Sequence, residues 1–113
     1  MALEKAAELS ALTDNTPFKT EVEGVPVTLV KIGEQVYAVH DTCSHQDYSL
    51  SEGIVWDTQI ECALHGSMFD LTDGTPESLP ATRPVPVFPV EIDGDQVLVD
   101  VQNPSNDAPF PNH

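Results

Sequence analysis

Each of the two cysteines in this chain is followed closely by a histidine, in two short segments of similar form. Cys43 is followed by His45, and Cys62 by His65, with sixteen residues between His45 and Cys62. The chain has only two cysteines and four histidines, so these segments contain all of its thiols and half of its imidazoles. Thiolates and imidazoles bind zinc and iron, and one of each from two segments makes a set of four ligands.

Several explanations fit these residues alone. The cysteines could be small buried side chains and the histidines hydrogen-bonded polar ones, although the repeated pairing argues against chance. A disulfide between Cys43 and Cys62 would be disfavoured in the reducing cytoplasm, and it leaves both histidines unexplained. Two metal centres stay open: a structural zinc site, or a two-iron, two-sulfide cluster with the cysteines on one iron and the histidines on the other.

The rest of the sequence predicts strands that would position these segments. Runs rich in β-branched and aromatic residues cover 18–22, 25–32, 35–39, 58–61, 67–71, 86–92 and 96–101. Short glycine-containing connections, such as Gly33-Glu34 and Asp93-Gly94-Asp95, are typical of hairpins. Residues 5–12 could form a short helix by propensity. We therefore expect an all-β fold, an antiparallel sandwich or open barrel of about eight to ten short strands.

Acidic residues outnumber basic ones by nineteen to four, which gives a formal net charge of −15. Between Lys31 and Arg83 the sequence has nine acidic residues and no basic one. Nucleic acid and anionic membrane are therefore poor partners, because binding phosphate requires cations. The charge serves either solubility or the steering of this chain toward basic protein partners.

The length of 113 residues suits one domain. No apolar run approaches the roughly 20 residues that span a bilayer, and the N-terminus is not a basic signal-peptide start, so we expect a cytoplasmic protein. We expect the domain to cover residues 1–101, followed by a polar, proline-rich tail that frays over residues 102–113.

The two segments resemble the Rieske cluster-binding motif. The resemblance rests on Cys43-x-His45 and on Cys62-x-x-His65-Gly66-Ser67-x-Phe69-Asp70. Residues 45–53, 60–62 and 88–99 extend it to the small Rieske ferredoxins of bacterial ring-hydroxylating dioxygenases. It covers about residues 5–101, and the double motif is its specific part.

This resemblance implies a Rieske iron-sulfur fold, with two cluster-binding loops at one tip and a proline loop around Pro80 that shields the cluster. It implies one Rieske-type [2Fe-2S] cluster per chain, with Cys43 and Cys62 on one iron and His45 and His65 on the other. It also implies an electron-transfer component rather than an enzyme. Such a carrier takes electrons from a flavoprotein ferredoxin reductase and passes them, by transient docking, to a terminal oxygenase. We expect a monomer.

The ligand types and a few neighbouring residues set the expected redox potential. Imidazoles in place of two thiolates leave the centre less negative, which raises its potential. High-potential respiratory Rieske proteins also have a tyrosine hydroxyl near the second loop, where this chain has Phe69, and a cysteine pair, where it has Tyr48 and Leu64. A low to intermediate potential follows. We expect Trp56, Met68 and Phe69 to pack around the loops, and His40 to be a filler residue.

Two other functions remain open at this point. One is the Rieske-type small subunit of an assimilatory nitrite reductase, although many of those lack the ligands that this chain has. The other is a zinc-stabilised interaction module. The aromatic substrate would be chosen by the oxygenase, and this sequence does not name it.

Overall fold

The computed structural model describes residues 3–41, 49–61, 68–75 and 84–106, which form ten strands and two short 3-10 helices. The strands are β1 (Glu4–Glu8), β2 (Phe18–Val22), β3 (Val25–Ile32), β4 (Gln35–His40), β5 (Ile54–Trp56), β6 (Gln59–Glu61), β7 (Met68–Asp70), β8 (Val87–Phe88), β9 (Val90–Asp93) and β10 (Gln96–Val99). The 3-10 helices are η1 (Leu9–Ala11) and η2 (Leu50–Glu52).

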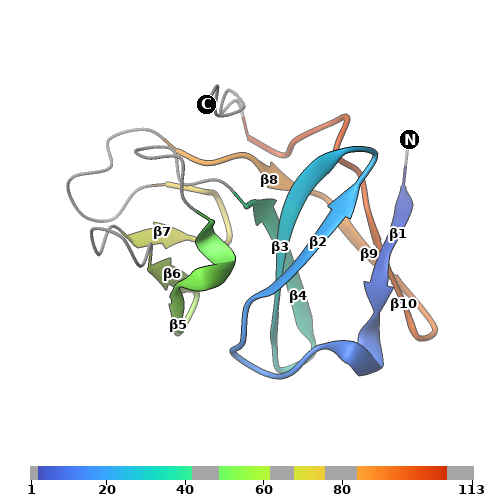
Figure 1. Cartoon of the computed structure of the whole chain (residues 1–113), viewed down its shortest axis with the longest axis horizontal. Helices are drawn as coiled ribbons and strands as arrows, with labels where there is room; N and C mark the ends of the chain where they lie inside the picture. Colours follow the sequence, from blue (N-terminus) through green and yellow to red (C-terminus); the bar gives the residue numbers. More distant parts are fainter. Residues whose placement is uncertain (1–2, 42–48, 62–67, 76–83, 107–113) are drawn as a thin grey trace.

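The strands form three antiparallel sheets (Figure 1). Their orders are β1-β10-β9, β2-β3-β4-β8 and β5-β6-β7. The first two sheets make up the larger part of the molecule, and the small β5-β6-β7 sheet lies at one end of it. The predicted all-β, antiparallel fold is therefore confirmed. Among the residues that the structure describes, no helix is long and apolar enough to span a membrane.

Two apolar clusters hold these sheets together. The first joins strands of the two larger sheets and includes Val22, Leu29, Phe88, Val97 and Val99. The second cluster joins the β5-β6-β7 sheet to the neighbouring sheet. Its buried members are Val30, Val39, Leu50, Ile60, Phe69, Leu71, Val85 and Val87. Because burying each such side chain contributes about 1.5–3 kcal/mol, the small sheet is fixed against the larger part of the molecule.

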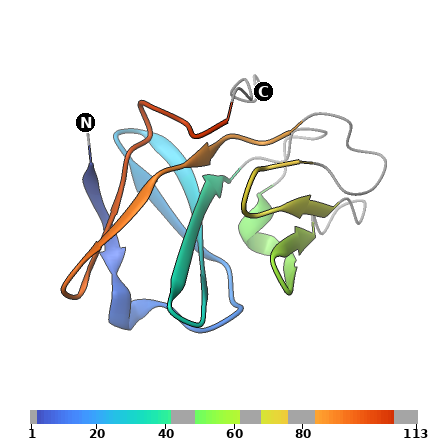
Figure 2. The same cartoon turned by 180° about the vertical axis from the view of Figure 1, so that it is seen from behind.

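Proline marks the point where the chain changes sheets. Pro89 separates β8, which pairs with β4, from β9, which pairs with β10. Figure 2 shows the orange segment of the chain running from β8 in the second sheet into β9 in the first. The predicted run 86–92 is therefore two strands, since proline lacks the N–H that would continue one ladder.

Two strands were not predicted. Residues 4–8 form β1, which pairs with β10 and has an irregularity between Lys5 and Ala7, so the helical propensity of residues 5–12 yields only the turn η1. Pairing with an edge of the sheet outweighs a weak helical preference. The second is β5, whose three residues are too few to give a pattern in the sequence.

The start of the predicted tail is bound to the fold. The side chain of Asn106 accepts from the N–H of Val87 at 3.0 Å and donates to the carbonyls of Asp73 and Val85 at 2.9 and 2.8 Å. The N–H of Ser105 donates to the carbonyl of Val87 at 2.6 Å. Residues 105 and 106 are thus hydrogen-bonded to the rest of the fold. The frayed tail over residues 102–113 stays a prediction, and residues 107–113 lie outside the described part.

Candidate metal centre

All four predicted ligands lie outside the described residues. Cys43 and His45 fall within 42–48, and Cys62 and His65 within 62–67. The structure therefore describes the positions from which each ligand-bearing segment begins and ends. These are Asp41 and Ser49 for the first segment, and Glu61 and Met68 for the second. The packing of these four residues decides whether the two ligand segments begin close together in space.

The residues on either side of a ligand segment are called its base here. In the first segment they are joined by Asp41, which directly follows β4. The backbone carbonyl of Asp41 accepts from the N–H of Leu50, and its carboxylate accepts from the N–H of Ser51 at 2.9 Å. The same carboxylate accepts from the hydroxyl of Thr28 on β3. Lys19 Nζ lies 3.6 Å from its second oxygen. Residues 41 and 50–51 are thereby fixed to each other and to β3.

Asp41 is charged although its side chain is almost fully buried. Burial alone would raise the pKa of this carboxyl, since it disfavours the charged form. The hydrogen bonds from Thr28 and from the serines of residues 49–51 outweigh that effect and hold the pKa of Asp41 below its usual range. A carboxylate has two acceptor oxygens, whereas the amide of asparagine, a neutral side chain of the same size, has one.

The second segment is closed at its base by a ladder pair. Glu61 at the end of β6 pairs with Met68 at the start of β7, next to the pair of Ile60 and Phe69. Ile60 and Phe69 are fully buried in the second apolar cluster together with Leu50. The bases of both segments therefore rest on the same cluster.

Gly53 brings the two bases into contact. A Cβ atom at this position would lie 1.7 Å from the backbone oxygen of Glu61 and 3.2 Å from that of Leu50. No side chain fits in that space, so only glycine allows residues 50–53 to lie against the end of β6. The base of the first segment, at Leu50, thus adjoins that of the second, at Glu61.

The segment 76–83, which contains the predicted proline loop, also begins and ends at a closed base. The N–H of Val85 donates to the carbonyl of Gly74 at 3.0 Å, and Asn106 bridges the two sides. A Cβ atom at Gly74 would lie 2.1 Å from the oxygen of Val85, and its φ of 75° also requires glycine. Val85 belongs to the same apolar cluster as Leu50 and Ile60. Three segments that carry predicted functional residues thus extend from one cluster.

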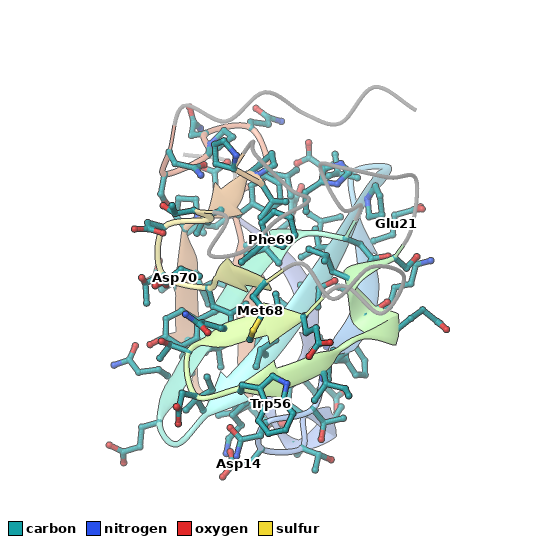
Figure 3. All side chains as sticks on the ribbon, turned by 90° about the vertical axis from the view of Figure 1, so that its left-hand side faces the viewer. Asp14, Glu21, Trp56, Met68, Phe69 and Asp70 are labelled. Atoms are coloured by element: carbon teal, nitrogen blue, oxygen red, sulfur yellow. The ribbon has the colours of Figure 1, made fainter. Side chains whose placement is uncertain are left out.

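The structure changes one predicted role and supports two others. Phe69 and His40 are buried, as expected of packing residues. Trp56 was also expected to pack around the loops, but its side chain is 55% exposed. It lies at the end of the edge strand β5, on the face turned away from the apolar cluster (Figure 3). Sequence reasoning also missed Asp41, Gly53 and Asn106, whose roles depend on contacts between distant parts of the chain.

The donor set suits a two-iron cluster with mixed ligands. Two thiolates and two imidazoles, carried on two segments with adjoining bases, can supply one pair of ligands of each kind. Among residues 3–41, 49–61, 68–75 and 84–106, no group of three or more His, Cys, Asp or Glu side chains could hold a metal ion.

Comparisons with known proteins identify the family of the chain. The Rieske [2Fe-2S] domain family matches residues 2–89. The ferredoxin component of biphenyl 2,3-dioxygenase from Rhodococcus jostii (strain RHA1) is 37% identical over 90% of this chain and 95% of its own length. The ferredoxin of carbazole 1,9a-dioxygenase from Nocardioides aromaticivorans IC177 superposes with a TM-score of 0.84 and 35% identity. That superposition covers 88% of this chain and 97% of the other.

A third relative occurs in a solved complex of reduced oxygenase and oxidised ferredoxin in carbazole 1,9a-dioxygenase. One chain of it superposes with a TM-score of 0.80 at 37% identity, over 86% of this chain and 91% of the other. The chain described here belongs to the Rieske [2Fe-2S] domain family, among proteins named as ferredoxin components of dioxygenase systems. This family carries a Rieske-type [2Fe-2S] cluster, which decides against the zinc site.

Proposed function

We propose that this chain is a one-electron carrier that passes electrons from a flavoprotein reductase to the terminal oxygenase of an aromatic-ring dioxygenase system. Its relatives named as dioxygenase ferredoxin components match it over nearly their whole length. The solved complex of such a ferredoxin with its oxygenase supports the same direction of transfer here. The observation that carries the proposal is the contact of Gly53 with Glu61, by which the bases of both ligand segments adjoin.

The proposed ligands are Cys43 and Cys62 for one iron, and His45 and His65 for the other. When bound, the [2Fe-2S] cluster would take up and release one electron at a potential of about −150 to +300 mV. The described residues hold the two ligand segments in position. Asp41 and Ser51 hold the base of the first segment, and the pair of Glu61 and Met68 holds that of the second. A fixed base keeps ligands in place between the two oxidation states.

The charge of the chain suits a carrier that binds its partners briefly. A net charge of −15 raises the rate of encounter with basic surfaces and opposes the association of two copies. We therefore propose a cytoplasmic, monomeric protein that docks to its reductase and oxygenase in turn. Its electron-transfer rate with either partner should fall as ionic strength rises.

A reductive titration tests the proposal. The purified protein is titrated with dithionite under anaerobic conditions, and the reduced form is then mixed with ferric cytochrome c as a one-electron acceptor. We expect one electron per chain to be taken up and the same electron to be returned. A protein that takes up no electron, or takes up two per chain, would not be the proposed carrier.

A further inference from the structure

The outer face of the β5-β6-β7 sheet presents large apolar side chains to solvent. Residues directly opposite on paired strands share a face, and so do alternate residues of one strand. Val55, Ile60 and Phe69 point toward the second apolar cluster. The opposite side, here called the Trp56 face, consists of Ile54, Trp56, Gln59, Glu61, Met68 and Asp70.

The exposure of this face is unusual for the chain. Ile54 and Trp56 are each 55% exposed, and Ile92, at 39%, is the one other large apolar side chain so exposed among the described residues. Met68 lies in the same row of the sheet as Ile54, with Glu61 between them. Figure 3 looks onto this end of the molecule, with Trp56 and Met68 over the sheet. Ile54 and Trp56 are two residues apart on β5, and Met68 lies across the sheet on the same face. Three apolar side chains on one small face form a patch, whereas single exposed residues would not.

The indole of Trp56 is held in place. Its Nε1 donates to a carboxylate oxygen of Glu61 at 3.0 Å. A tryptophan that is already oriented loses little side-chain freedom when a partner covers it, and tryptophan is among the residues that contribute most to protein interfaces. The Trp56 face therefore has the central feature of a docking surface.

The charges around the face determine what can cover it. Glu61 and Asp70 lie on the face, Asp57 follows Trp56, and the sequence has no Lys or Arg between Lys31 and Arg83. A second copy would bring like charges together, on chains that each carry −15. A partner with an apolar centre and a rim of Lys and Arg would be matched in both polarity and charge.

We propose that the Trp56 face is the docking surface for the electron-accepting partner, a redox protein with an apolar surface rimmed by Lys and Arg. Glu61 directly precedes Cys62, and Met68 comes three residues after His65. A partner seated on this face contacts the two residues from which the second ligand segment begins and ends. The inference rests on the proposed electron-carrier function and adds where the acceptor binds.

Stopped-flow kinetics with two acceptors test this proposal. Ferric cytochrome c is the probe, because it is a basic protein that accepts one electron. Ferricyanide, a small anion that needs no protein surface, is the reference acceptor. We expect Trp56→Ala to lower the second-order rate constant with cytochrome c about fivefold or more, as expected for an interface residue of this kind. The rate with ferricyanide should stay within about twofold, because the cluster itself is unchanged.

Two further variants serve as controls. Ile92→Ser removes an exposed apolar residue from β9, in another sheet, and should leave both rates as in the wild type. Trp56→Phe keeps an aromatic ring and should recover most of the rate. Each variant is checked by circular dichroism and iron content, so that a folding defect is recognised.

Two results would count against the proposed docking surface, and a third would count against the electron-carrier function on which it rests. Equal cytochrome c rates for Trp56→Ala and Ile92→Ser would show that the face does not dock the acceptor. A wild-type dimer in sedimentation velocity that Trp56→Ala separates would assign the face to a second copy. A reduced wild type that transfers electrons to neither acceptor would instead overturn the electron-carrier function itself.

Discussion

The backbone N–H of Ser51 donates to the carboxylate of Asp41 over 2.9 Å and so closes the base of the segment that carries Cys43 and His45. The same carboxylate accepts from Thr28, in the middle of β3. The base of the first ligand segment is thus tied to an interior strand of the four-stranded sheet. A rigid element holds ligands more precisely than a loop that is held only by itself.

Replacing Asp41 should destabilise the protein markedly. Asp41→Ala leaves the buried hydroxyl of Thr28 and the N–H of Ser51 without their acceptor, and each such loss costs about 1–3 kcal/mol. We expect the free energy of unfolding to fall by about 3 kcal/mol, measured by urea denaturation. Asp14→Ala is the matched control, because Asp14 pairs with Lys31 at the surface and should contribute less than about 1 kcal/mol. Equal losses for both variants would show that Asp41 has no special role.

Gly53→Ala tests the contact between the two bases. The added Cβ would overlap the backbone oxygen of Glu61, so either residues 50–53 or β6 must move. We expect a loss of about 3 kcal/mol in stability and a lower iron content after purification. Gly33→Ala is the control. The φ of 63° at Gly33 is strained for alanine, but an added Cβ would meet no atom within 4 Å. That variant should lose about 1 kcal/mol and keep its iron. A Gly53→Ala protein as stable and iron-rich as Gly33→Ala would contradict the contact.

Asn106 should matter more than its place near the C-terminus suggests. Asn106→Ala removes three hydrogen bonds that join residues 73, 85 and 87, and we expect it to lower the free energy of unfolding by about 2–3 kcal/mol. Asn103→Ala removes one bond, to Asp100, and should cost less than about 1 kcal/mol. Thermal unfolding of both variants measures the difference. Identical midpoints would mean that residues 102–106 do not stabilise the fold.

Much of this fold could be predicted from the sequence, because alternating apolar runs mark β2, β3, β4, β9 and β10 directly. The short strands β1 and β5 could not, since their pairing depends on neighbours distant in the chain. The same holds for the site. The spacing of Cys43, His45, Cys62 and His65 indicates the ligands, and the family comparison agrees with the cluster they imply.

The residues that support the four predicted ligands have no recognisable pattern in the sequence. Asp41 looked like one of nineteen acidic residues, and Gly53 like one of six glycines. Trp56 looked like a packing residue, because apolar character in a sequence does not reveal which face of a short strand is covered.

Phe69→Tyr tests the predicted low to intermediate potential. Phe69 is fully buried on β7. The sequence resemblance implies that it occupies the position of a tyrosine whose hydroxyl bonds to sulfur in high-potential Rieske proteins. A new bond of about 1.4 kcal/mol in favour of the reduced state would raise a one-electron potential by about 60 mV. Phe88→Tyr adds the same hydroxyl to the other apolar cluster and should leave the potential unchanged. An EPR-monitored redox titration measures both, and a Phe69→Tyr potential equal to or below the wild type would contradict the prediction.

The central claim is that Cys43, His45, Cys62 and His65 hold a Rieske-type [2Fe-2S] cluster. The most direct measurement is the EPR spectrum of the dithionite-reduced protein, with iron and zinc counted on the same sample. The account predicts a rhombic signal with a low average g value and two irons per chain, both lost in Cys62→Ser. A colourless, EPR-silent protein with one zinc per chain would contradict it.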